Sequence, residues 1–174
     1  MTTDYLSESL TKDDLLGEHL SDLVNDSVKR HSKNKAFSCV LPTGHHAGIT
    51  FEELGYYTDC VAAYLREELG LVPGDVVAIQ SPNTLGYPVV AFGIAKAGLI
   101  ITNVNPLYTD EETQYQLQDS RAKVLFTIDV FGNRLAQSVS GTQVSKVIRL
   151  SVADLFPTLQ RTILQFGMRY IKKV

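Results

Sequence analysis

Short apolar runs alternate with longer stretches of helical periodicity along most of the chain. Four apolar runs bounded by turn residues predict buried strands, at 76–80, 99–104, 123–128 and 146–150. Between them, apolar residues recur every three or four positions, which is typical of helices that bury one face. Strands that alternate with helices predict βαβ units and a parallel sheet.

Two capping boxes mark where predicted helices begin. Thr50 and Thr109 are each followed three residues later by a glutamate, Glu53 and Glu112. In such a box the threonine oxygen accepts from the glutamate amide, and the glutamate carboxylate accepts from the threonine amide. The other helices are expected at 14–31, 84–97 and 131–139, and after Pro157.

The segment between residues 36 and 50 has a different pattern, because two strand-like runs flank a Pro-Thr-Gly turn. The runs 36–41 and 48–50 predict a short hairpin. Together with the βαβ pattern, this predicts an α/β fold: an open, mainly parallel sheet with helices on both faces and a short peripheral hairpin. Residues 1–13 are polar without a clear period, so we expect a flexible tail there and one domain over 14–174.

Composition narrows the class of protein. The chain has 174 residues, of which 44% are hydrophobic, enough for one core. Its net charge of −3 disfavours sequence-independent nucleic-acid binding, which usually needs a basic protein. No run is long enough for a membrane span, and the first residues lack the pattern of a secretory signal. Cys39 and Cys60 have no zinc-ligand spacing and fit a reducing compartment, so we expect a cytoplasmic protein.

No catalytic, cofactor-binding or metal-ligating constellation stands out in the sequence. Gly93 and Gly98 have the gap of a phosphate-binding loop, but leucine follows where that loop requires lysine. We therefore interpret Gly98 as the end of a helix. His45 and His46 are adjacent without a third ligand nearby, and we interpret them as a solvated pair. Cys60 lies in a predicted helix, where we expect a packed thiol and not a nucleophile.

Uncharged turn residues follow two of the predicted strands, at the edge where parallel sheets usually bind ligands. They are Pro82, Asn83, Asn105, Pro106 and Tyr108. The two amide side chains and the phenol suit an apolar or neutral ligand better than a triphosphate. A triphosphate needs cations or a cluster of backbone amides. A second interpretation is that these residues only cap helices and end strands, since Asn and Pro are ordinary turn residues. The residues alone leave both interpretations open.

The last segment of the chain is basic. Residues 152–174 contain Asp154 and four basic residues, mixed with apolar and aromatic ones. This pattern predicts a basic amphipathic helix, which could lie on an anionic membrane or pack on the sheet.

The run from Pro82 to Thr109, PNTLGYPVVAFGIAKAGLIITNVNPLYT, resembles the matching run of bacterial long-chain fatty-acid–CoA ligases. These ligases belong to the adenylate-forming, AMP-binding superfamily of acyl-CoA synthetases. The run ITFEEL at 49–54 is similar to the first core motif of that superfamily, and the resemblance continues at 116–120 and 170–173. The resemblance implies that residues 14–174 are the N-terminal subdomain of an AMP-binding domain.

The resemblance also implies a role in fatty-acid activation. Such ligases join a fatty acid to ATP with release of pyrophosphate, and CoA then displaces AMP to give the thioester, while Mg²⁺ offsets phosphate charge. The family's phosphate loop, Tyr-Gly-x-Thr-Glu motif, ribose-binding aspartate and lid lysine all lie beyond Val174. The resemblance therefore assigns no catalytic, cofactor-binding or metal residue here, and we expect this chain to be inactive alone. In a complete enzyme, the residues after the strands would contribute to an acyl pocket or mark the fold.

Two other functions stay open. The chain could be a free-standing interaction module, in which exposed apolar surface favours a homodimer. It could also be a peripheral membrane module that uses its basic last helix. The sequence departs from the family at position 110, where it has Asp110 and family members often have proline. Either residue suits the start of a helix.

Overall fold

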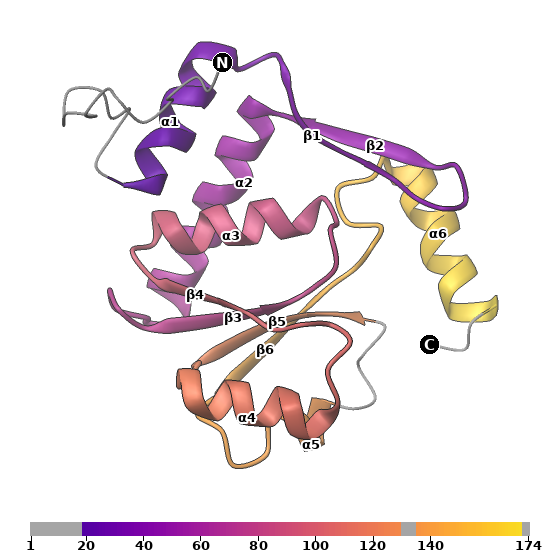
Figure 1. Cartoon of the computed structure of the whole chain (residues 1–174). Helices are drawn as coiled ribbons and strands as arrows, with labels where there is room; N and C mark the ends of the chain where they lie inside the picture. The colour runs from indigo at the N-terminus through magenta and orange to yellow at the C-terminus, as the bar shows by residue number, and fades with distance from the viewer. Residues whose placement is uncertain (1–18, 130–134, 172–174) are drawn as a thin grey trace, which may run out of the picture.

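Four parallel strands form the central sheet of the protein, in the order β4-β3-β5-β6 (Figure 1). The computed structural model describes residues 19–129 and 135–171. The strands are β3 (Val76–Gln80), β4 (Ile100–Asn103), β5 (Val124–Ile128) and β6 (Lys146–Leu150). All three pairings between neighbours are parallel. The predicted parallel sheet is therefore confirmed, with each strand ending within one residue of its expected bounds.

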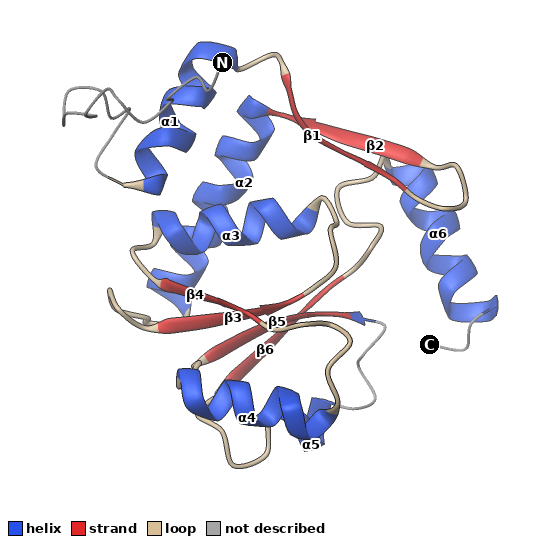
Figure 2. Ribbon diagram, in the orientation of Figure 1, coloured by secondary structure: helices blue, strands red, loops and turns tan. Residues whose placement is uncertain are grey.

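Helices cover both faces of this sheet, as Figure 2 shows. On one side lie α2 (Phe51–Ala63) and α3 (Gly86–Lys96), with α1 (Leu20–His31) packed beside them. On the other side lie α4 (Asp110–Ser120) and the short α5 (Leu135–Ser138). A π-helical turn, η2 (Tyr64–Glu68), extends α2. The predicted α/β class, with helices on both faces, is confirmed.

Alternate residues of each strand supply two separate cores, because side chains of a strand point to opposite faces. Val77 and Ile79 of β3 pack with Ile94 beneath α3. Ala78 packs with Leu117 beneath α4. All five side chains are at most 1% exposed. Burial on both faces explains the uninterrupted apolar runs that predicted these strands.

Two glycines shape the α3 helix. Gly93 lies where α3 crosses α2, and a Cβ there would stand only 2.6 Å from the Cβ of Val61. Only glycine permits so close an approach. Gly98 follows the helix with a φ of +72°, in the left-handed region that favours glycine at a helix C-terminus. The interpretation of Gly98 as a helix end is confirmed.

Both capping boxes form as predicted. At the start of α2, the Glu53 amide donates to Thr50 Oγ1 at 3.2 Å and the Thr50 amide donates to Glu53 Oε2 at 2.8 Å. The same pair of distances occurs between Thr109 and Glu112 at the start of α4. Each box satisfies amide groups that the first helical turn would otherwise leave unpaired.

The peripheral hairpin consists of β1 (Lys35–Val40) and β2 (His46–Thr50), which pair antiparallel. β2 begins two residues before the expected 48–50, because the turn is closed by a hydrogen bond from the Leu41 amide to the carbonyl of His45, 2.8 Å long. The ring of Phe37 in β1 packs on Phe92 of α3, with centroids 6.2 Å apart. This contact attaches the hairpin to the helical layer.

Two further expectations are corrected. The helix expected at 84–97 begins only at Gly86, because Thr84 belongs to the turn after β3 and accepts from the Tyr87 amide at 3.3 Å. The predicted packing of Cys60 is wrong: this residue is exposed on the outer side of α2. A hydrogen bond with Cys60 raises the pKa of the Tyr56 phenol, one turn earlier on the same side.

The last helix, α6 (Thr158–Ile171), follows Pro157 directly, as predicted. It stands to one side of the sheet, near the hairpin, and covers neither face (Figure 1). The expected tail at 1–13, the first residues of the helix expected at 14–31, and 131–134 of the short helix lie outside the described residues.

Candidate functional site

The order of the strands reverses between β3 and β5, which creates a topological switch point at the carboxyl edge of the sheet. β4 and β5 lie on opposite sides of β3, so the connections that leave β3 and β5 diverge there. In open α/β sheets such a switch point leaves a crevice beyond the carboxyl ends of the strands, where ligands bind.

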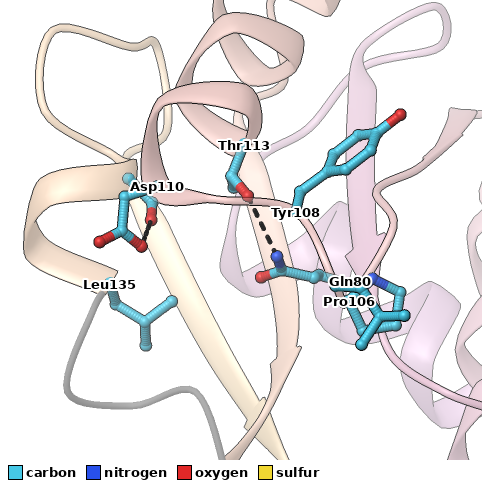
Figure 3. A pocket seen from close by; sticks show the side chains of 8 residues that line it. Gln80, Pro106, Tyr108, Asp110, Thr113 and Leu135 are labelled. Carbon is cyan, nitrogen blue, oxygen red and sulfur yellow. Dashed lines mark hydrogen bonds between the residues drawn. The ribbon is translucent and has the colours of Figure 1, made fainter.

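A pocket of about 180 Å³ opens at this edge, between the end of β3 and the helices α4 and α5 (Figure 3). Its lining combines uncharged polar side chains with a few apolar ones and a single carboxylate. The lining residues are Gln80, Pro106, Leu107, Tyr108, Asp110, Thr113, Leu135 and Ser138. The lining thus contains one acidic and no basic residue.

Gln80, the last residue of β3, forms the floor of this pocket. Its side chain is buried, with 5% exposed, and its amide bridges two elements. Gln80 Nε2 donates to Thr113 Oγ1 of α4 at 3.2 Å, as the dashed line in Figure 3 marks. Thr127 Oγ1 of β5 donates to Gln80 Oε1, also at 3.2 Å. The amide is therefore held in one orientation by two buried hydroxyl groups.

A second polar contact closes the far side of the pocket. Ser138 Oγ of α5 donates to Asp110 Oδ1 at the start of α4, at 3.1 Å. This bond joins the two helices that form the wall. The lining can offer hydrogen bonds to a small neutral group, whereas bound phosphate requires cations or a nest of amides.

Sequence reasoning missed Gln80, Thr113, Thr127 and Ser138. A signal did exist for two of them, since a glutamine ends the apolar run of β3 and a threonine interrupts that of β5. A polar residue inside a buried strand needs a partner, so it indicates a hydrogen-bonded network. Which helix supplies that partner is decided by the packing of α4 on the sheet.

The structure divides the predicted site residues between two loops. Pro106 and Tyr108 line the pocket at the switch point. Asn105 forms the turn beneath them: its Oδ1 accepts from the Leu107 amide at 2.9 Å, and its carbonyl accepts from the Tyr108 amide at 3.1 Å. These contacts are those of a turn residue, in line with the second interpretation of Asn105.

Asn83 lines a different hollow, on the other side of the sheet. This groove, of about 330 Å³, runs between β1 of the hairpin and α3. Its lining is mainly apolar and includes Phe37, Leu85, Pro88 and Phe92. Pro82, on the same loop, lines neither hollow, and its carbonyl accepts from Ser81 Oγ at 2.9 Å. The five predicted residues therefore do not converge on one point.

Other candidate groups can be placed as well. His45 Nδ1 lies 3.0 Å from Thr43 Oγ1 in the hairpin turn, and His46 is exposed at the start of β2. Within residues 19–129 and 135–171, no three His, Cys, Asp or Glu side chains are grouped closely enough to hold a metal ion. Over the same residues, no helix has the length and apolar character of a membrane span.

Comparison with known families identifies the fold. The family model described as AMP-binding enzyme matches residues 24–166. The chain belongs to this AMP-binding family. Its similarity to a long-chain-fatty-acid–CoA ligase of Escherichia coli is 38% identity over 157 residues, which cover 90% of this chain and 27% of the relative. The ligase of the same name from Salmonella typhimurium is 42% identical over 126 residues, or 72% of this chain and 22% of the relative.

This AMP-binding chain spans about a quarter of the length of these curated relatives. Solved structures show the same fold. A long-chain-fatty-acid–CoA ligase from Archaeoglobus fulgidus superposes with a TM-score of 0.68 at 19% identity, over 79% of this chain and 29% of that one. An anthranilate CoA ligase bound to anthranoyl-AMP superposes with a TM-score of 0.70 at 23% identity, over 81% and 27%. The resemblance to bacterial fatty-acid–CoA ligases is confirmed.

Proposed function

We propose that this chain is the N-terminal subdomain of a cytoplasmic long-chain fatty-acid–CoA ligase. The observation that carries the proposal is the identity of 38% over 157 residues to a ligase of that name. In the proposed reaction, a carboxylate oxygen of the fatty acid attacks the α-phosphorus of ATP and pyrophosphate leaves. The CoA sulfur then attacks the acyl carbonyl carbon, and AMP leaves as the thioester forms.

In this proposal ATP and Mg²⁺ bind the part of the ligase that is absent from this chain. Acyl transfer of this kind needs preorganised donors around the phosphates. No basic residue lines the pocket or the groove described above. The 174-residue chain alone is thus expected to release no pyrophosphate from ATP in the presence of Mg²⁺ and palmitate.

The two hollows at the carboxyl edge suit different parts of a substrate. The groove beside Asn83 is lined mainly by apolar side chains, among them Phe37 and Phe92, and suits part of an acyl chain. The pocket beside Pro106 and Tyr108 is polar and uncharged except for Asp110, and suits a neutral group. We propose that the groove contributes one wall of the acyl site in the complete ligase.

A chimeric enzyme tests the proposed function. Residues 19–171 of this chain replace the aligned segment of the Escherichia coli ligase, and palmitoyl-CoA formation is measured with ATP, Mg²⁺ and CoA. We expect the chimera to retain activity within about tenfold of the parent, which corresponds to about 1.4 kcal/mol in the barrier. A matched chimera with Phe92→Asp, which places a charge in the groove, should lose activity toward palmitate.

Two results would contradict this function. The first is a folded chimera that makes no acyl-adenylate, as judged by pyrophosphate release. The second is ATP-dependent turnover by the isolated 174-residue chain. The alternative function, a free-standing module that forms a homodimer, stays a prediction. Light scattering of the isolated chain tests it by measuring the molar mass in solution.

A further inference from the structure

The pocket between β3, α4 and α5 contains hydrogen-bond donors that the protein itself does not use. The Gln80 amide has two N–H groups, and Thr113 Oγ1 accepts from one of them at 3.2 Å. Within residues 19–129 and 135–171, no group accepts from the second N–H or from the hydroxyl of Thr113. Both side chains line the pocket and are buried, with 5% and 1% exposed. One wall of the pocket therefore presents sheltered donors.

Thr127 determines which end of the Gln80 amide meets α4. Its hydroxyl, fully buried in β5, donates to Gln80 Oε1 at 3.2 Å. The amide nitrogen is consequently the end that contacts Thr113, as the dashed line in Figure 3 shows. A buried donor without an acceptor costs free energy, so a ligand that supplies an acceptor at this wall gains affinity.

The opposite wall of the pocket presents an acceptor. Asp110, which is half-buried at the start of α4, lies across the pocket from Gln80 in Figure 3. Its Oδ1 accepts from Ser138 Oγ at 3.1 Å. Over the part of the chain that the structure describes, no donor pairs with Asp110 Oδ2. Because no basic residue lines the pocket, this carboxylate keeps its negative charge uncompensated.

A carboxamide matches both walls at once. Its carbonyl oxygen can accept from Gln80 and Thr113, while its N–H group donates to Asp110. A carboxylate would be repelled by Asp110 and would find no cation in the lining. An ammonium group would pair with Asp110 but leave the donors without an acceptor, and a ketone would satisfy only the donors. The remaining lining, with Pro106 and Leu135, suits a short apolar body.

We propose that this pocket binds a small neutral carboxamide with a short apolar or aromatic body. The volume of about 180 Å³ is below the ~300–1,000 Å³ typical of sites for drug-sized ligands, which restricts the ligand to a small one. The site is separate from the apolar groove beside Asn83, because Gln80, Asp110 and Thr113 do not line that groove. The proposal does not rest on ligase activity.

An NMR titration of the 174-residue chain with three probes of equal shape tests it. Benzamide, acetophenone and benzoate carry an amino group, a methyl group or a charged oxygen at the same position. We expect benzamide to shift the amide signals of the lining residues in a saturable way. Acetophenone should bind about tenfold more weakly, since it lacks the donor for Asp110. Benzoate should be weaker still, because it places a second negative charge beside Asp110.

A change of preference is the sharpest test of the acceptor wall. Asp110→Asn keeps an oxygen for Ser138 but replaces the charged oxygen by an amino group. It should weaken benzamide about tenfold and strengthen benzoate, so that the preference for benzamide is lost. Asp119→Asn is the matched control, since Asp119 is exposed at the other end of α4 and lines no part of the pocket. It should bind all three probes as the unmodified chain does.

A second pair of variants tests the donor wall. Thr113→Val should weaken benzamide and acetophenone alike, each about tenfold, because both rely on the same donors. Thr58→Val is its control, a buried threonine of α2 that lies outside the pocket lining. Circular dichroism of all four variants verifies that they remain folded.

Several results would overturn the proposal. They are the absence of saturable shifts, equal affinity for the three probes, equal losses in a variant and its control, and shifts confined to the groove between Phe37 and Phe92. Equal affinity would mean an apolar hollow without polar recognition. Every readout is binding to the 174-residue chain, so failure here is distinct from failure of the ligase chimera.

Discussion

The two faces of the sheet are packed with different chemistry. Beneath α2 and α3 the core cluster consists of apolar side chains, and the helices approach so closely that only Gly93 fits at their crossing. Beneath α4 and α5 the apolar cluster is smaller, and the network of Gln80, Thr113 and Thr127 occupies the edge. The first face is built for tight packing, whereas the second combines packing with a pocket that can form hydrogen bonds.

The largest effect is expected on the tightly packed face. Gly93→Val would place a Cβ 2.6 Å from Val61, and overpacking of this kind costs about 3 kcal/mol. Gly86→Ala is the matched control in the same helix, because its new Cβ would meet atoms only at 3.7 Å or beyond. It should change the free energy of unfolding by less than about 1 kcal/mol. Urea unfolding followed by circular dichroism measures both, and equal effects would contradict the difference between the two sites.

A smaller effect is expected in the polar network. Thr113→Val keeps the shape of the side chain but removes the oxygen that accepts from Gln80, leaving a buried donor unpaired at a cost of about 2 kcal/mol. Thr58→Val is the control on the other face. Thr58 is equally buried, but its hydroxyl donates only to the carbonyl of Gly55, 2.9 Å away in its own helix.

The comparison between these threonines is sharpened by a double variant. Gln80→Leu combined with Thr113→Val replaces both partners of this hydrogen bond by apolar groups. The losses in the free energy of unfolding caused by the two single substitutions should therefore not add, and the coupling energy should be about 1 kcal/mol. Additive losses would indicate that the hydrogen bond does not contribute to stability. The same urea experiment reports all three variants.

The smallest effect concerns an ion pair at the opposite, amino edge of the sheet. Lys123 Nζ lies 2.7 Å from Asp75 Oδ1, and together with the Val72 amide it lowers the pKa of the Asp75 carboxyl. A lowered pKa means that the pair stabilises the fold at pH values above the unfolded pKa of about 3.9. This contribution is lost as the pH falls through the lower, folded value. Asp75→Asn should reduce the loss of stability as the pH falls below about 4, because the variant has no carboxyl to titrate at this position. Acid unfolding of the unmodified chain and of Asp75→Asn is followed by fluorescence or circular dichroism. Identical profiles for the two proteins would show that the ion pair does not contribute to stability.

Local patterns predicted most of the fold, because the strands and capping boxes depend on residues close together in sequence. The apolar runs predicted the four strands of the parallel sheet to within one residue, and both threonine–glutamate boxes form. The exposure of Cys60 depends on which side of α2 meets α3, and that is a property of tertiary packing. A buried thiol was therefore a wrong prediction that no local pattern could have corrected.

The candidate site was less predictable than the fold. Pro106 and Tyr108 follow a strand and do line the pocket, yet the side chains that hold its floor come from three separate elements. Gln80 and Thr127 are visible in the sequence as polar residues of otherwise apolar strands, but their hydrogen bond joins residues 47 positions apart. Asn105 and Asn83 look alike in sequence, whereas only the turn geometry shows that Asn105 bonds to its own loop.

The central position of β3 has a consequence for how the chain emerges during synthesis. Val77 pairs with Ile101 of β4 on one side and with Val124 of β5 on the other. A ribosome that has released only the residues before Val124 therefore presents a β3 strand with one open edge. Unpaired edges of this kind are templates for association with other chains. This edge of β3 becomes protected only when β5 has left the exit tunnel, so the interval between the synthesis of β3 and that of β5 is one in which a nascent chain needs a chaperone.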